Sequence, residues 1–310
     1  HLRPYNVTPD ALLVNFKSVL MHFTPDPEAG VARVRSEPPL AGLTVDASVP
    51  LTTRACVDWR LRLQADFSDP NAIRLLGTYA EACGTNVWPV AYQDPPSFAA
   101  RALEGLWRQG GGALTGRVRS GTRPAAARLL LSADSLPLRD IMADVNQFSN
   151  NVMAQQVFLS LTAPPAVARF ERSREVLARW WTRTFGLDVA APVVDNGSGL
   201  SRQERITPSA LLHLLRHAAQ HPEALAFQQS LAVAGVNGTT RRLAQRPNSL
   251  ANGRAWIKTG TLRDVAGIAG YVDTRSGQRL VVIAFIHHER ANQGRAALDA
   301  VLEWAAEQRL

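Results

Sequence analysis

The chain has 310 residues, with 34 Lys and Arg against 26 Asp and Glu and a formal net charge of +8. Its basic residues are scattered, with no dense cluster and no basic run interleaved with aromatics. This disfavours a nucleic-acid-binding protein and indicates a solvated, arginine-rich surface. No stretch reaches the roughly 18 uninterrupted apolar residues that a membrane-spanning helix needs, and the length allows about two domains.

Residues 1–94 are predicted to form a β-rich module. Apolar and polar residues alternate in short stretches separated by Pro and Gly, which is typical of half-buried antiparallel strands. The expected strands cover residues 12–15, 18–23, 31–35, 43–49 and 59–65. Both cysteines of the chain, Cys56 and Cys83, lie here. They are compatible with a disulfide, two free thiols or two buried apolar side chains. Because they form no CxxC and no His cluster accompanies them, no metal site is expected.

Residues 95–310 are predicted to form a second domain that mixes helices and strands. A helix is expected after Ser97, and further helices cover residues 137–146, 152–159, 167–185, 208–219 and 292–308. The expected strands cover residues 113–119, 127–131, 256–262, 265–272 and 279–286. Three consecutive strands before a terminal helix predict an α+β fold, with an antiparallel sheet and helices packed against it.

The lysine at position 258 is unusual because only Lys17 and Lys258 among the basic residues are not arginine. Arginine is permanently charged, whereas surroundings can shift the pKa of a lysine. Lys258 begins a Lys-Thr-Gly triplet on a predicted strand, and such a triplet is shared by serine β-lactamases and penicillin-binding proteins. A second polar element, Ser149-x-Asn151, lies at a predicted helix–helix junction and offers a hydroxyl and a carboxamide for hydrogen bonding.

Together these elements resemble a known family. The chain is similar to the C-terminal two-thirds of a D-alanyl-D-alanine carboxypeptidase/endopeptidase of the class C, low-molecular-mass penicillin-binding type. The matching segments are Tyr5-Asn6-Val7, Pro9–Asn15, Ser149-Asn150-Asn151, Asp195–Arg202, Val233–Thr239, Lys258–Leu262 and Ala269–Val272. The resemblance implies a serine β-lactamase/DD-peptidase-like domain, with an antiparallel sheet flanked by helices, preceded by part of a β-rich inserted module. It implies no cofactor and no metal.

One element of the family is missing from the sequence. The family's nucleophile lies in a Ser-x-x-Lys motif, but the residues three positions before the two lysines are Val14 and Ala255. In the family this motif precedes the inserted module. We therefore expect the chain to be a fragment that lacks its nucleophile and its first sheet strands, and to be inactive by itself.

The resemblance also implies roles for individual residues. Ser149, Asn151 and Lys258 would be catalytic, with Ser149 and Lys258 passing a proton to the leaving D-alanine. The substrate would be bound by Thr259, Gly260 and Thr261. Leu200 and Arg202 would face the pocket for the peptidoglycan side chain, and the alternative for Arg202 is a structural ion pair.

A family member of this kind acts on peptidoglycan stem peptides and binds β-lactams, in the periplasm or otherwise outside the cytoplasm. Thiols oxidise there, so a disulfide between Cys56 and Cys83 is predicted, against the alternative of two buried thiols. One rival interpretation is a β-lactamase or esterase, but the related β-lactamases use Tyr where Ser149 stands. Another is a non-catalytic peptidoglycan-binding or scaffolding protein, although the retained Lys258 favours a working site.

Overall fold

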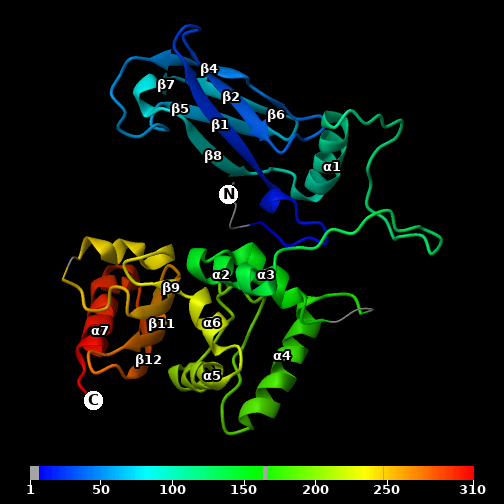
Figure 1. The fold of residues 1–310 in the computed structure, drawn as a ribbon. Helices are drawn as coiled ribbons and strands as arrows, with labels where there is room; N and C mark the ends of the chain where they lie inside the picture. Colours follow the sequence, from blue (N-terminus) through cyan, green and yellow to red (C-terminus); the bar gives the residue numbers. More distant parts are fainter. Residues whose placement is uncertain (1–6, 163–165, 247) are drawn as a thin grey trace. The chain divides into compact units, whose positions relative to one another are not determined.

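The structure, a computed structural model, describes residues 7–162, 166–246 and 248–310. Tyr5 and Asn6, which contribute to the family resemblance, lie outside these ranges. The chain forms two compact units, residues 1–131 and residues 132–310, shown in Figure 1. None of the helices in the described ranges is long and apolar enough to cross a membrane.

The first unit contains two β-sheets around one core. The strands are β1 (Ser18–Asp26), β2 (Val31–Glu37), β3 (Thr44–Val45), β4 (Ser48–Thr52), β5 (Leu63–Asp69), β6 (Ala72–Gly77), β7 (Tyr79–Ala80) and β8 (Asn86–Ala91). They form a five-stranded sheet in the order β7-β4-β2-β1-β8 and a three-stranded sheet in the order β3-β6-β5. Alternate residues of β1 (Val19, Met21 and Phe23) are fully buried, because successive side chains of a strand point to opposite faces of the sheet.

Several predicted strands of this unit differ from the observed ones. Residues 12–15 form a turn and the start of a short 3-10 helix (Asn15–Lys17), and residues 59–62 form turns before β5 begins at Leu63. Trp59 packs against the core whereas Leu61 is exposed, so the alternation there is not that of a paired strand. Lys17, the lysine outside the Lys-Thr-Gly triplet, is buried, with its Nζ 2.7 Å from Asp10 Oδ2.

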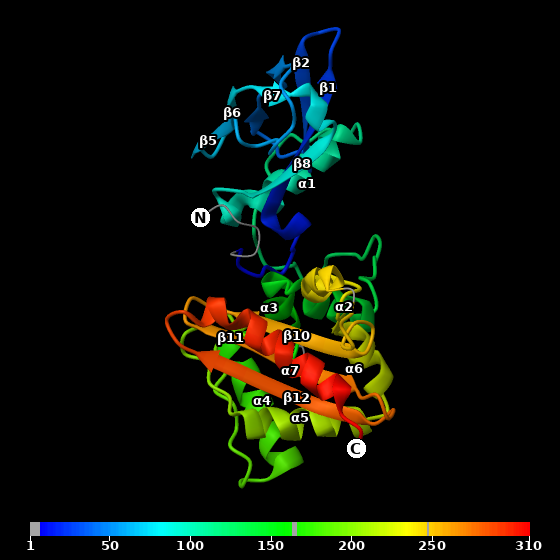
Figure 2. The same cartoon turned by 90° about the vertical axis from the view of Figure 1, so that its left-hand side faces the viewer.

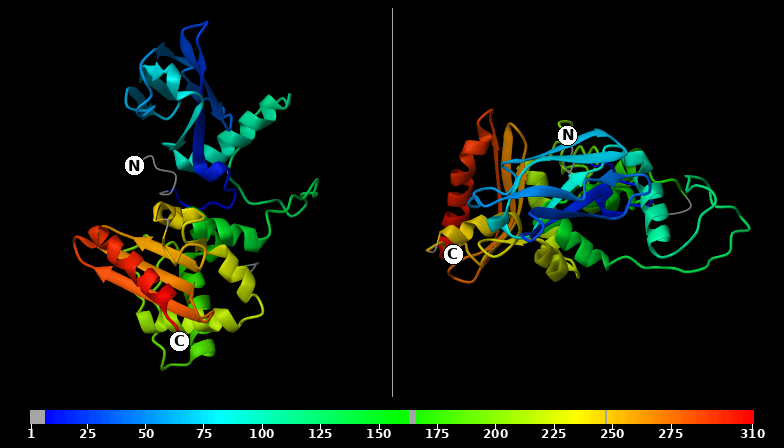
Figure 3. Two further views of the ribbon diagram at one scale, coloured as in Figure 1. Left: turned by 60° about the vertical axis from the view of Figure 1, so that its left-hand side comes forward. Right: turned by 90° about the horizontal axis from the view of Figure 1, so that it is seen from above.

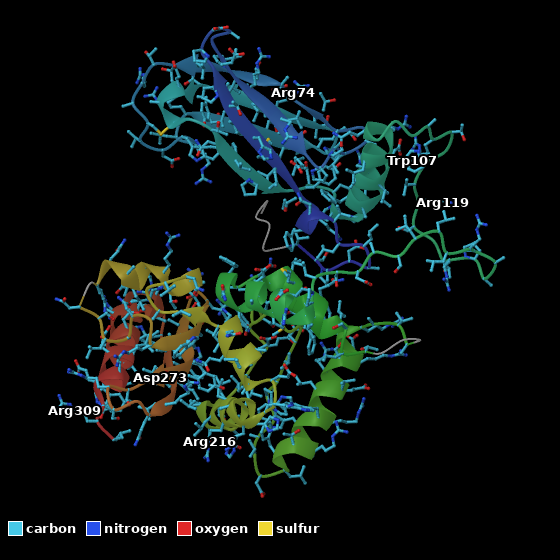
Figure 4. The ribbon with its side chains drawn as sticks, viewed as in Figure 1. Arg74, Trp107, Arg119, Arg216, Asp273 and Arg309 are labelled. Carbon is cyan, nitrogen blue, oxygen red and sulfur yellow. A yellow bond between two sulfur atoms is a disulfide. The ribbon has the colours of Figure 1, made fainter. Side chains whose placement is uncertain are left out.

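The two cysteines of the first unit are bonded to each other. Cys56 and Cys83 form a disulfide with an S–S distance of 2.05 Å, visible as a yellow bond in Figure 4. It closes a loop of 27 residues. The structure therefore contains the disulfide that was predicted from the oxidation of thiols outside the cytoplasm.

The first unit extends beyond the boundary suggested at residues 94 and 95. Helix α1 (Phe98–Gln109) places Phe98 and Ala102 in the core of the β-sheets, and its Arg101 carbonyl accepts a hydrogen bond from the Ala41 amide at 3.0 Å. The segments 113–119 and 127–131, predicted as strands, contain no strand in the structure. Their residues are almost all exposed, so their apolar residues are not paired with a sheet.

The second unit is built on an antiparallel sheet. Its strands are β9 (Ala232–Val233), β10 (Ala255–Thr261), β11 (Val265–Asp273) and β12 (Arg279–His287), in the order β12-β11-β10-β9. Its helices are α2 (Leu138–Phe148), α3 (Asn151–Leu159), α4 (Phe170–Phe185), α5 (Pro208–Gln220), α6 (Ala224–Ser230) and α7 (Arg295–Glu307). The three long strands and the terminal helix agree closely with the sequence prediction, because their apolar periodicities extend over whole elements.

Helices cover both faces of this sheet. Helix α7 packs its buried Leu298 and Leu302 against Ile257 of β10 on one face, and Figures 2 and 3 show α7 lying across the strands. On the other face, Leu215 of α5 packs against Tyr271 of β11, and the Tyr271 hydroxyl donates a hydrogen bond to the Leu215 carbonyl at 2.7 Å. The sheet is therefore held rigidly between two layers, which fixes the position of β10.

Candidate active site

Ser149 is held in a special backbone conformation between two helices. It ends α2 with φ 53° and ψ 47°, in the left-handed region that residues other than Gly rarely adopt. The neighbouring Asn150 caps α3, its side-chain oxygen accepting a hydrogen bond from the Met153 amide at 3.1 Å. Val145 and Val152, one on each helix, are buried and anchor the junction. The two helices thus direct the Ser149 hydroxyl, with Asn151 beginning α3, into the same cleft.

Lys258 meets Ser149 across this cleft, although 109 residues separate them in the sequence. Its Nζ donates hydrogen bonds to Ser149 Oγ and, at 2.9 Å, to the Thr259 carbonyl oxygen. Burial disfavours the ammonium and lowers the pKa of Lys258 from 10.5 to about 8. A lysine with this pKa can both hold and release a proton near neutral pH, which an arginine cannot.

The open edge of β10 forms one wall of the cleft. Strand β9 pairs with β10 only at Trp256 and Ile257, and no other described strand pairs with this edge further along. From Lys258 to Thr261 the strand therefore lines a cleft of about 660 Å³. A side chain at Gly260 would meet no atom within 4 Å, so the space beside this residue is free for a ligand. An extended peptide can pair with such an edge.

Hydroxyl groups accompany this strand. The Thr259 hydroxyl donates a hydrogen bond to Thr239 Oγ1 at 2.9 Å, and Thr261 Oγ1 accepts one from the Arg295 guanidinium at 3.4 Å. Hydroxyls and a cation at one end of the cleft favour an anionic group there.

The loop from Asp195 to Arg202 also contributes to the wall of the cleft. Gly197, Ser198, Gly199 and Leu200 line the cleft. The Arg202 guanidinium instead donates to both carboxylate oxygens of Asp264, at 2.9 and 3.0 Å. This hydrogen bonding holds the pKa of Asp264 below its usual value. The structure therefore brings Leu200 to the cleft and places Arg202 in an ion pair beside it.

Some cleft residues were not identified from the sequence. Thr239, Arg242 and Arg295 line the cleft. Thr239 ends the Val233–Thr239 segment that contributes to the family resemblance, which could have indicated it. The two arginines belong to no local motif. Arg295 reaches the cleft at the start of α7, and Arg242 reaches it from the 3-10 helix Gly238–Gln245, where it is hydrogen-bonded to Asp299 of α7. The described ranges contain no group of three or more His, Cys, Asp or Glu that could hold a metal ion.

The fold of the chain resembles that of a solved penicillin-binding protein. Penicillin binding protein 4 (dacB) from Haemophilus influenzae, crystallised with a β-lactam, matches with a TM-score of 0.67 and 19% identity. The match covers 95% of this chain and 70% of that chain. The likeness shows the fold, and it confirms the predicted α+β, DD-peptidase-like architecture.

Sequence comparisons point to the same family. D-alanyl-D-alanine carboxypeptidase DacB of Haemophilus influenzae is 28% identical over 203 residues, which cover 64% of this chain. The D-alanyl-D-alanine carboxypeptidase of Actinomadura sp. is 31% identical over 226 residues, which cover 69% of this chain. The matched part of the chain spans 41% of the length of each relative. The model of the D-Ala-D-Ala carboxypeptidase 3 (S13) family matches residues 2–308, and the chain belongs to this family.

Proposed function

We propose that this chain carries most of the active site of a serine-type D-alanyl-D-alanine carboxypeptidase/endopeptidase that acts on peptidoglycan stem peptides and binds β-lactams. The observation that carries the proposal is the hydrogen bond between Lys258 Nζ and Ser149 Oγ on the wall of the cleft. Family membership and the resemblance of the fold support it. The disulfide between Cys56 and Cys83 supports a periplasmic or other extracytoplasmic location.

The nucleophile is the serine of a Ser-x-x-Lys motif outside the 310 residues, because the chain contains no such motif. The serine Oγ attacks the carbonyl carbon of the penultimate D-alanine, and the lysine of the motif accepts its proton. The C–N bond breaks, so that the terminal D-alanine leaves and an acyl-enzyme remains. Water then hydrolyses the ester and restores the serine. The acyl-enzyme thus divides one difficult step into two.

In this mechanism Ser149 and Lys258 deliver the proton to the departing amine. The Lys258 pKa of about 8 supports this role, since the proton can be given and recovered near neutral pH. A positive charge on Lys258 also disfavours charge on the neighbouring lysine of the motif and keeps that lysine available as the base.

The remaining residues bind the substrate. The peptide lies along the open edge of β10, next to Gly260, and the Asn151 carboxamide holds its amide group. The Thr261 backbone N–H stabilises the oxyanion together with that of the nucleophile. The hydroxyls of Thr259 and Thr261 hold the terminal carboxylate, and Leu200 borders the pocket for the rest of the stem peptide.

The alternative is a non-catalytic peptidoglycan-binding or scaffolding protein, which the absence of Ser-x-x-Lys from these residues would favour. Fluorescent penicillin, followed by denaturing electrophoresis, separates the two functions. We expect the full-length protein to be labelled stoichiometrically and to release D-alanine from a peptide ending in D-Ala-D-Ala. We expect the 310-residue chain to remain unlabelled.

Each part of the proposal has its own contrary result. An inert full-length protein would refute the enzyme and favour the scaffold. A labelled band from the 310-residue chain would show that the nucleophile lies within it.

A further inference from the structure

The charged residues that line the cleft are Arg242, Lys258 and Arg295, and all three are basic. Two of them make short hydrogen bonds to other groups of the protein. The Arg242 guanidinium donates to both carboxylate oxygens of the buried Asp299, at 2.7 and 2.6 Å. Lys258 donates to Ser149 and to the Thr259 carbonyl. Asp299 therefore neutralises the charge of Arg242, whereas Lys258 has neutral partners and directs its N–H donors at Ser149 and Thr259.

Arg295 differs from both. Within the described residues, no carboxylate lies at ion-pair distance from its guanidinium, which donates a hydrogen bond to the neutral Thr261 hydroxyl at 3.4 Å. An arginine has five N–H donors in a planar fork, so this one contact leaves most of them available. Its charge therefore lies beside the Lys-Thr-Gly strand without a neutralising partner.

The packing of α7 fixes where Arg295 stands. Arg295 is the first residue of α7, and Leu298, one turn further along, is buried against the sheet. Asp299 follows and is tied to Arg242. Because residues three apart lie on neighbouring positions of a helix surface, the anchoring of Leu298 holds the Arg295 backbone at the end of β10.

We propose that Arg295 binds the C-terminal carboxylate of the substrate peptide, together with the Thr261 hydroxyl, and selects peptides whose C-terminus is free. This inference rests on the proposed function and adds a charged residue to it. A guanidinium matches the geometry of a carboxylate and can bind it through two parallel hydrogen bonds. Since Arg295 is exposed, its contribution should weaken as the salt concentration rises.

The test compares two ligands, an N-acetylated peptide that ends in D-Ala-D-Ala and the same peptide with a C-terminal carboxamide. Their affinities are measured by isothermal titration calorimetry with the full-length protein, in which the proposed nucleophilic serine is replaced by alanine so that bound peptide is not consumed. We expect the peptide with the free carboxylate to bind about 10-fold more tightly than the peptide with the carboxamide. This is near the lower end of the range for hydrogen bonds to charged groups, because the site is exposed to solvent. Arg295→Gln should abolish this preference, and Arg295→Lys should retain part of it.

The matched control is Arg290→Gln, which removes the same charge from an exposed residue just before α7 that does not line the cleft. It should leave the preference unchanged. The inference is overturned if the protein with Arg295 intact binds both peptides with equal affinity. It is also overturned if Arg295→Gln keeps the preference for the carboxylate peptide, or lowers the affinity for both peptides by the same factor. Because these measurements need no turnover, they test Arg295 even if the intact protein fails to release D-alanine, which would refute the proposed function separately.

Discussion

Replacing Lys258 by Arg in the full-length protein tests whether this residue moves a proton or only provides charge. With a pKa of about 8, about a quarter of the Lys258 side chains are neutral at pH 7.5, against roughly one in a thousand at the ordinary value of 10.5. The neutral fraction of an arginine is negligible at this pH. Loss of a proton-transfer group typically costs about 100- to 10,000-fold in rate. We therefore expect Lys258→Arg to slow acylation by at least about 100-fold.

The structure adds a steric reason for this loss. Lys258 Nζ is placed between Ser149 Oγ and the Thr259 carbonyl oxygen, and a planar guanidinium is wider than the ammonium that fits there. Ile257, the preceding residue, is fully buried on the α7 face. Because neighbouring side chains of a strand point to opposite faces, a change at Lys258 should affect the cleft more than the core.

The assay is the second-order rate of acylation by a fluorescent penicillin, measured with thermal unfolding of each variant. Lys17→Arg is the matched control, since it makes the same chemical change at the other lysine, which pairs with Asp10 in the first unit. Its acylation rate should equal that of the wild type. A Lys258→Arg rate within a few-fold of wild type would show that Lys258 serves only as an anchor for an anion.

Three further predictions concern stability. Because the folded-state pKa of Lys258 lies below its unfolded value, the unfolded chain binds more protons between about pH 8 and 10.5, and wild-type stability rises with pH there. The Lys258→Met variant should therefore be more stable than wild type at pH 7, by up to about 3 kcal/mol. The difference should disappear by pH 10.5, and urea unfolding at the two pH values measures it. Replacing Cys56 and Cys83 together by Ser should lower the free energy of unfolding of the first unit by about 3 kcal/mol, measured by urea denaturation. Asp299→Asn should cost about 2 kcal/mol, less than for a fully buried pair, because Arg242 remains 39% exposed and can be hydrated.

Each of these stability predictions has a clear contrary result. A Lys258→Met advantage that is constant from pH 7 to 10.5 would refute the pKa shift. Equal denaturation midpoints with and without the disulfide would remove its stabilising role. For Asp299→Asn the matched control is Asp273→Asn, whose pair with Arg279 is more exposed and should cost less than about 1 kcal/mol. Similar losses in the two variants would contradict the importance of burial.

Helices and strands with a continuous apolar periodicity could be predicted from the sequence, whereas short alternations could not. Strands β11 and β12 and helices α2 and α5 were predicted within a few residues, because each carries a continuous periodicity and clear boundaries. The segments 113–119 and 127–131 carry similar apolar residues but form no strand. A strand needs a neighbour to satisfy its backbone hydrogen bonds, and a short alternation in the sequence does not reveal whether one exists.

The sequence alone was enough to identify the family and to single out Ser149 and Lys258, because their chemistry is carried by short motifs that do not depend on distant residues. It also indicated that Ile257 and Lys258 point to opposite faces, which follows from the geometry of any strand. Only the tertiary structure could bring Arg295 to Thr261 and pair Arg202 with Asp264. These residues lie far apart in the sequence and belong to no shared pattern, so their contacts depend on how α7 and the Asp195–Arg202 loop pack around β10.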